Sequence, residues 1–226
     1  GDHLASCTSI RAKDRTVTHD RILRLVASLE TAARIPTEVE PRGQNAARAQ
    51  ITQPNGNVKL VNRLLDLWSG DGHLSANGKQ TLSDVTGTHG ITSATYSNAG
   101  GLKELSSILE DKAKDKNKKH KEAVESIDRN FRPLVFETIS GALHKDFKDF
   151  ITSRSEIIAD RTGMPVGTVR SQWMQKFQCI IRSEVAQTIN SRVERLLNRR
   201  YPRNSHQELR EELSTTILVR ISDQWE

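Results

Sequence analysis

The segment Gln-Thr-Leu-Ser-Asp-Val-Thr, residues 80–86, is strand-like and carries one acidic residue, Asp84. Two other strand-like segments carry acids: Glu40 ends Thr37–Glu40, and Asp66 lies within Val61–Trp68. Residues 69–78 between the second and third segments are rich in turn residues and predict a hairpin connection. Neighbouring strands lie about 4.8 Å apart, so acids on adjacent strands can converge on one cation.

The strand-like segments are preceded by a predicted helix over residues 18–34. Thr18 is the expected N-cap, and Pro36 is expected to end the helix. Its apolar residues recur at helical spacing: Ile22, Leu25, Val26, Leu29 and Ala33. Residues 43–59 contain Gly, Asn, Gln and Pro with little pattern, and we expect a loop there.

The second half of the chain is mostly helical in pattern. A long polar helix is predicted over residues 101–128, followed by a strand over Phe131–Thr138. From residue 142 onward the pattern is helical, with an apolar stripe of Trp173, Phe177, Ile180, Ile181, Val185 and Ile189. Cys179 lies in this stretch, where we expect a buried thiol. The order predicts an α/β or α+β core with an α-helical C-terminal part.

Composition bounds the class of protein. The formal net charge is +6 and the sequence pI is about 9.5, which permits a polyanionic partner. Two cysteines cannot form a disulfide framework, which favours a reducing compartment. No apolar run approaches the roughly 20 residues of a membrane span, so no membrane association is expected. The chain begins with Gly1 rather than methionine, and we expect a piece of a longer protein.

Acids on strands and a nearby lysine-rich helix together indicate phosphodiester chemistry. Mg²⁺ prefers hard oxygen ligands and keeps several of its waters, so two or three carboxylates suffice to hold it. A lysine can steady the attacking water or the phosphate, and Lys116 and Lys119 are the candidates. The alternative is that these acids are solvated strand ends and that the six lysines of residues 112–121 form a solvated helical face.

An ordered series of short motifs resembles the C-terminal restriction-endonuclease-like domain of non-LTR (LINE-type) retrotransposon proteins. Thr-His-Asp-Arg-Ile and Ile-Pro-Thr-Glu-Val-Glu-Pro-Arg-Gly are similar to its first helix and Glu-Pro strand. Arg-Leu-Leu-Asp-Leu, Asp-Val-Thr-Gly-Thr-His-Gly, Lys-Asn-Lys-Lys-His and the strand at residues 131–138 match later landmarks in order. The likeness covers about residues 1–200.

The resemblance implies a PD-(D/E)xK nuclease: an α/β fold with a restriction-endonuclease-like mixed sheet flanked by helices. Asp66 and Asp84 would be ligands of Mg²⁺ or Mn²⁺, with Glu40 as a helper acid. Lys116 or Lys119 would be the catalytic lysine, delivered from a helix. In the family this activity nicks target DNA, and the new 3′ hydroxyl primes reverse transcription. The implied partners are duplex DNA, the rest of the polyprotein and, as a further candidate, the element RNA, in the nucleus.

The remaining assignments concern nucleic-acid contacts and domain limits. The expected nucleic-acid contacts are His19, Arg42, His89, Lys118 and Lys121. We expect residues 1–17 to be the tail of an upstream knuckle or linker, 18–150 the endonuclease-like core, and 151–226 a helical C-terminal extension. His3 and Cys7 could be the last two ligands of a zinc knuckle, although two ligands cannot close a tetrahedral site.

Three departures from the family pattern leave an alternative function open. Leu65 stands where the family has proline, Gly87 where it has a branched residue, and His120 where it has tyrosine. They favour a catalytically inactive module of the same fold that serves as a nucleic-acid-binding or protein-interaction scaffold. A further alternative is a helical interaction domain built around the C-terminal apolar stripe.

Overall fold

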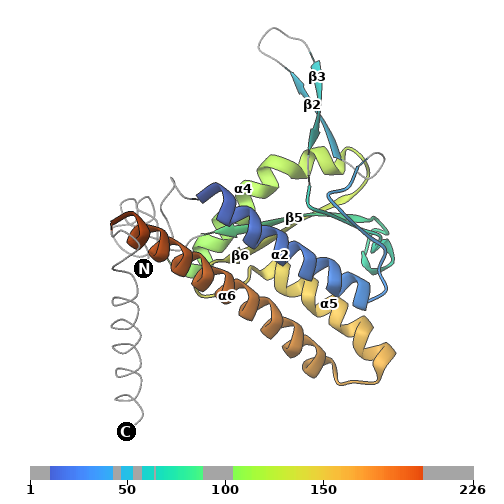
Figure 1. Ribbon diagram of the computed structural model, residues 1–226. Coiled ribbons are helices and arrows are strands. Elements are labelled where there is room, and N and C mark those ends of the chain that lie inside the picture. Colours follow the sequence, from blue (N-terminus) through green and yellow to red (C-terminus); the bar gives the residue numbers. More distant parts are fainter. Residues whose placement is uncertain (1–10, 43–46, 53–57, 64, 89–103, 201–226) are drawn as a thin grey trace.

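The computed structural model describes residues 11–42, 47–52, 58–63, 65–88 and 104–200 (Figure 1). In chain order its elements are α2 (Arg11–Ala32), β1 (Thr37–Val39), β2 (Ala47–Thr52), β3 (Val58–Arg63), β4 (Leu67–Ser69), a 3₁₀ turn η3 (Gly72–Leu74), β5 (Thr81–Thr88), α4 (Leu105–Glu125), β6 (Asn130–Glu137), α5 (Lys145–Thr162) and α6 (Val166–Arg200). Among these residues, no helix is both long and apolar enough to cross a membrane.

Four strands form one mixed sheet in the order β1-β4-β5-β6. β1 and β5 each run antiparallel to β4, whereas β6 runs parallel to β5. α4 makes the crossover between the two parallel strands, as such a connection requires. Pro133 is tolerated in β6 because this strand lies at the edge of the sheet. The prediction of an α/β fold with a mixed sheet and flanking helices is confirmed at this level.

Helices cover both faces of the sheet. Figure 1 shows α4 on one side of β5 and β6, and α2, α5 and α6 on the other. Leu82 packs with Val124 on the α4 side, whereas Val85 joins the large cluster on the opposite side. Because successive side chains of a strand point to opposite faces, β5 contributes to both layers. Asp84, two residues after Leu82, therefore faces α4.

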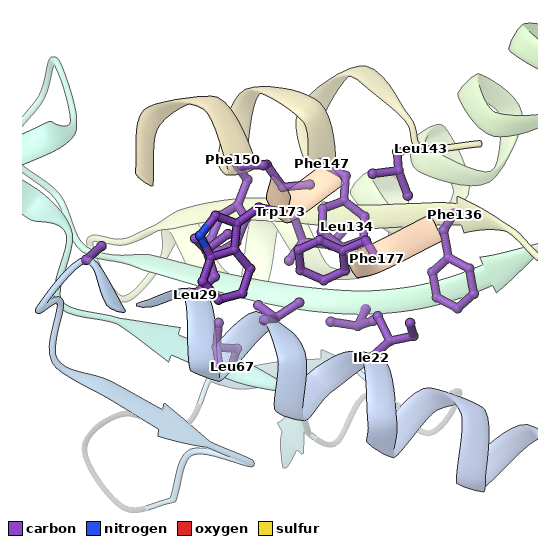
Figure 2. Packing of buried hydrophobic residues seen from close by; sticks show 14 of the residues in the cluster. Ile22, Leu29, Leu67, Leu134, Phe136, Leu143, Phe147, Phe150, Trp173 and Phe177 are labelled. Carbon is purple, nitrogen blue, oxygen red and sulfur yellow. The ribbon is translucent and has the colours of Figure 1, made fainter. Parts of the chain in front are cut away.

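The largest hydrophobic cluster joins α2 and the sheet to the C-terminal helices. Phe147 of α5 and Phe177 of α6 are fully buried, and their ring centroids lie 5.0 Å apart in an edge arrangement. Figure 2 shows these two rings beside Leu134 of β6 in the middle of the cluster. The expected limit between residues 150 and 151 falls inside α5, and the cluster takes residues from both sides of it.

Several element limits differ from the sequence expectation. α2 begins at Arg11, so Thr18 lies inside the helix and is not its N-cap. The predicted strand over residues 61–68 is divided between the end of β3 and the start of β4. Cys179 is exposed, because it lies between the buried Phe177 and Ile181 on the outer side of α6, so the prediction of a buried thiol was wrong.

The prediction of a loop over residues 43–59 was also wrong in part. β2 and β3 pair in antiparallel register from Ala47↔Arg63 to Thr52↔Val58 and form a separate two-stranded sheet. The sequence carries a signal for it, because Asn55-Gly56 between two strand-like runs favours a tight hairpin turn.

Candidate active site

Asp84 lies in the middle of β5 and faces α4. Its carboxylate is buried, with Oδ2 accepting hydrogen bonds from Thr86 Oγ1 at 2.5 Å and from Lys116 Nζ at 2.8 Å. Thr86 is two residues along the same strand, so its hydroxyl lies on the same face as the acid. The Lys116 side chain is only 18% exposed, so this ion pair is shielded from solvent. Charge-assisted bonds of this kind hold both groups in one geometry.

The helical period of α4 brings a second side chain to Asp84. His120 lies one turn after Lys116, and residues four apart share a helix face. Its Nε2 atom is 3.8 Å from Asp84 Oδ1, and its ring packs against Phe131 with centroids 5.6 Å apart. His120 is 3% exposed, so it closes the inner end of the site instead of contacting solvent.

Asp66 is fixed to β5 by both its backbone and its side chain. Its N–H donates to the Ser83 carbonyl at 3.1 Å, and its Oδ2 accepts from the Val85 N–H at 2.6 Å. The β4–β5 pairing runs no further in this direction than Leu67↔Ser83, so the Asp66 carboxylate occupies the place of a strand partner for Val85. It is thereby held beside the residue that follows Asp84.

His19 of α2 completes the surroundings of Asp66. Its Nε2 atom is 3.1 Å from Asp66 Oδ2, and its Nδ1 atom is 3.2 Å from Asp20 Oδ1. The hydrogen bond to Asp66 raises the pKa of His19 to about 9, against the opposing effect of burial, with Asp20 adding to the rise. Both ring nitrogens face carboxylates, so the imidazolium form suits the site. Lys116 and His19 then balance the charges of Asp84 and Asp66.

This pairing makes the stability of the cation-free protein depend on pH. The folded pKa of His19 lies above its unfolded value of 6.5, so its contribution is complete below pH 6.5 and is lost as pH rises through about 9. Because the side chain is 32% exposed, we expect a loss of roughly 1–2 kcal/mol after allowing for solvent screening. Urea unfolding at pH 6, 7.5 and 9.5 in EDTA measures it. His19→Gln should remove this part of the profile. Identical profiles for the two proteins would contradict the assignment.

Glu40 reaches the site through its backbone. It is an exposed residue with φ of 50°, and its N–H donates to the Asp66 carbonyl at 2.8 Å. This bond ties the end of β1 to the start of β4. The expectation that the Glu40 carboxylate assists the metal stays a prediction.

The remaining predicted residues separate into those at the site and those outside it. Lys116 contacts Asp84, whereas Lys119 is exposed, a position explained by the helical phase of α4. Lys118 and Lys121 are also exposed, and Lys121 lies 3.7 Å from Glu125. Arg42 is exposed next to the end of β1, where its N–H donates to Glu38 at 3.0 Å. His3, Cys7 and His89 lie outside the described residues.

The chemistry of the donors permits a hard divalent cation at Asp66 and Asp84. The contacts given above all use Oδ2 of either carboxylate, except the longer one from His120. Within the described part of the chain, no three His, Cys, Asp or Glu side chains form a group that could hold a metal ion. Mg²⁺ commonly binds one or two protein carboxylates and keeps several waters. By their chemistry alone, two carboxylates completed by water are donors of the kind that Mg²⁺ binds.

Neither histidine next to the acids was predicted to contact them. His19 was expected to face nucleic acid or the active site, and His120 was considered only as a departure from the family pattern. The signal for His120 was its spacing of four residues from Lys116. No protein-family model matches this chain, and no match is found among curated proteins. What the site can do therefore rests on its own geometry.

Proposed function

We infer that the protein is a metal-dependent DNA endonuclease that nicks its target. The single observation that carries this proposal is the Lys116–Asp84 ion pair, 2.8 Å long and largely buried, with the Asp66 carboxylate hydrogen-bonded to Val85, the residue after Asp84. A shielded lysine next to two fixed carboxylates is an arrangement suited to phosphodiester hydrolysis.

The residues would divide the chemistry as follows. Asp66 and Asp84 would hold Mg²⁺ or Mn²⁺, which supplies Lewis acidity and lowers the pKa of water. The Lys116 ammonium stabilises negative charge that develops on the phosphate, and it costs little reorganisation because it is already held in place. His19 orients the Asp66 carboxylate through Nε2. Lys116 and His19 also offset the two acids, so the site does not repel a phosphate as an uncompensated acid pair would.

The architecture supports the same proposal. A mixed four-stranded sheet flanked by helices is what the resemblance to restriction-endonuclease-like domains implies. The departures from the family pattern also have local explanations. A Cβ on Gly87 would lie 3.0 Å from Cζ of Phe136, so a branched residue would force that ring to move. Leu65 is buried with Leu82 and Val124. The retrotransposon context, with duplex DNA and element RNA in the nucleus, is proposed from the resemblance.

A matched pair of lysine substitutions on α4 tests the proposal. Lys116→Gln should lower the rate of plasmid nicking in Mn²⁺ by on the order of 10²–10³-fold, because it removes a preorganised cation. Lys119→Gln removes the same charge from an exposed position three residues away and should leave the rate near that of the parent. Circular dichroism spectra check that both variants fold. A Lys116→Gln protein that nicks at the parental rate would overturn the assignment.

A non-catalytic module of the same fold is the second candidate. It is favoured by the absence, in the described ranges, of any group of three metal-binding side chains. Calorimetric titration with Mn²⁺ separates the two functions. The endonuclease should bind Mn²⁺ and lose this binding in Asp66→Asn. A scaffold would bind DNA in a salt-sensitive manner with no Mn²⁺ binding and no nicking.

A further inference from the structure

The β2–β3 ribbon, residues 47–52 and 58–63, begins and ends at the candidate active site. It is inserted between β1 and β4, and the hydrogen bond from Glu40 N–H to the Asp66 carbonyl, 2.8 Å long, closes its base. Glu40 and Asp66 are therefore the last and first residues on either side of the insertion. Figure 1 shows the ribbon projecting away from the four-stranded sheet and its helices. The base of the insertion therefore lies next to Asp66, and the ribbon extends outward from it.

The composition of this insertion is one-sided. Residues 41–65 contain no Asp or Glu and four basic residues: Arg42, Arg48, Lys59 and Arg63. The whole chain has 28 acids in 226 residues, so about three would be expected in 25 positions at the average frequency. The same stretch has seven amide residues, of which Gln50 and Asn62 lie within the ribbon. An acid-free basic segment beside a site with balanced charge points to a polyanion.

We propose that the β2–β3 ribbon enters a groove of duplex DNA and holds the duplex across Asp66 and Asp84. The partner class rests on the proposed endonuclease function, but the ribbon's role in binding does not require cleavage. The ribbon is a sheet of only two strands in the part of the chain that the structure describes. A two-stranded ribbon fits the major groove, which is about 12 Å wide.

The dimensions of the ribbon set its reach. Six residues at about 3.3 Å each extend roughly 20 Å, which corresponds to about six base pairs. A two-stranded ribbon is only marginally stable by itself in water, and the ribbon is supported at α4 by β2. Arginine, asparagine and glutamine are also the residues that hydrogen-bond base edges in the major groove. The ribbon is thus suited to contribute to sequence preference as well as to affinity.

The test uses the full chain and a labelled duplex of 30 base pairs, followed by fluorescence anisotropy in EDTA so that no cleavage occurs. In the triple variant Arg48→Gln, Lys59→Gln, Arg63→Gln we expect roughly 10- to 100-fold weaker binding. We also expect the dependence of log affinity on log salt to become shallower by about 2–3. The matched control is Lys148→Gln, Arg170→Gln, Lys176→Gln, which removes three exposed charges from α5 and α6. It should bind within about threefold of the parent, because distant exposed charges act weakly through screening.

A second variant keeps the charge of the ribbon. Arg48→Lys with Arg63→Lys should retain the salt dependence but bind different duplex sequences with more equal affinity, because lysine lacks the bidentate geometry of arginine. Unchanged affinity and salt dependence in the triple variant overturn the proposal, as does an equal loss in the control. Salt-insensitive parental binding overturns it too and points to a protein partner for the ribbon. Failure of the endonuclease proposal is seen separately, as a parent that binds DNA through the ribbon without nicking it in Mn²⁺.

Discussion

Replacing Asp84 with asparagine should abolish plasmid nicking while DNA affinity stays within about threefold of the parental value. Asp84 joins β5 to α4 through the 2.8 Å contact with Lys116. The amide preserves shape and can still accept from Thr86, but it removes the negative charge that a divalent cation requires. Losing that charge should lower the nicking rate by on the order of 10³-fold or more. The rate is measured from supercoiled plasmid in Mn²⁺, and the affinity by anisotropy in EDTA.

The matched control for this substitution is Asp149→Asn. Asp149 is an exposed acid of α5 that pairs with Lys145 one helical turn away, so its loss should leave nicking unchanged. Thermal unfolding of Asp84→Asn is needed beside the assay, because Lys116 loses its partner in a largely buried position. A folded Asp84→Asn protein that nicks plasmid at the parental rate would show that the chemistry lies elsewhere.

The two acids could be chosen as candidates from the sequence because each lies in a short, strand-like segment. Asp66 and Asp84 lie in apolar, turn-bounded segments, and the antiparallel pairing of β4 with β5 places Asp66 next to Ser83 and Val85 of β5. The sequence does not show which of Lys116 and Lys119 lies next to Asp84. That choice depends on the rotational phase of α4 over the sheet, which Leu109, Ala113 and Val124 set by packing. A helix phase can be read from an apolar stripe, but six lysines in ten residues obscure it.

Other features depend on contacts between residues far apart in sequence. His19 precedes Asp66 by 47 positions, and nothing local to either residue indicates that they meet. The β2–β3 ribbon was not predicted for a different reason. Residues 43–59 contain Gly, Asn and Pro, which are typical of loops, and these obscured the alternation of polar and apolar residues in 47–52 and 58–63. Asp71 begins the 3₁₀ turn η3, and its side chain is 2% exposed and paired with Arg154, which is also distant in sequence.

Arg154 is the centre of a buried polar network between α2, α5 and the turn after β4. Its Nη2 atom donates to Glu30 Oε1 at 2.9 Å and to Asp71 Oδ2 at 2.6 Å, and its Nε atom donates to Glu30 Oε2 at 3.1 Å. All three side chains are at most 2% exposed. Arg132 lies 4.0 Å from Asp71, and burial, with Arg154 close by, lowers its pKa. The network links α2, which carries His19, to the turn that follows β4, which begins one residue after Asp66.

We expect Arg154→Met to destabilise the protein by about 3–5 kcal/mol, because it leaves Glu30 and Asp71 buried without their cation. Methionine fills much of the same volume, so the loss measures charge pairing more than packing. Lys145→Met on the same helix breaks an exposed pair with Asp149 and should cost less than about 1 kcal/mol. Urea unfolding followed by circular dichroism gives both values.

A triple variant distinguishes charge from shape in this network. Arg154→Met combined with Glu30→Gln and Asp71→Asn removes the uncompensated charges and should recover a large part of the lost stability, since neutral groups are easier to bury. Because the network fixes α2 against the turn after β4, Arg154→Met should also loosen the contact between His19 and Asp66. The His19-dependent change in stability between pH 6.5 and 9 should therefore shrink in Arg154→Met and return in the triple variant. An Arg154→Met protein as stable as Lys145→Met would mean that the helices are held by the aromatic cluster alone.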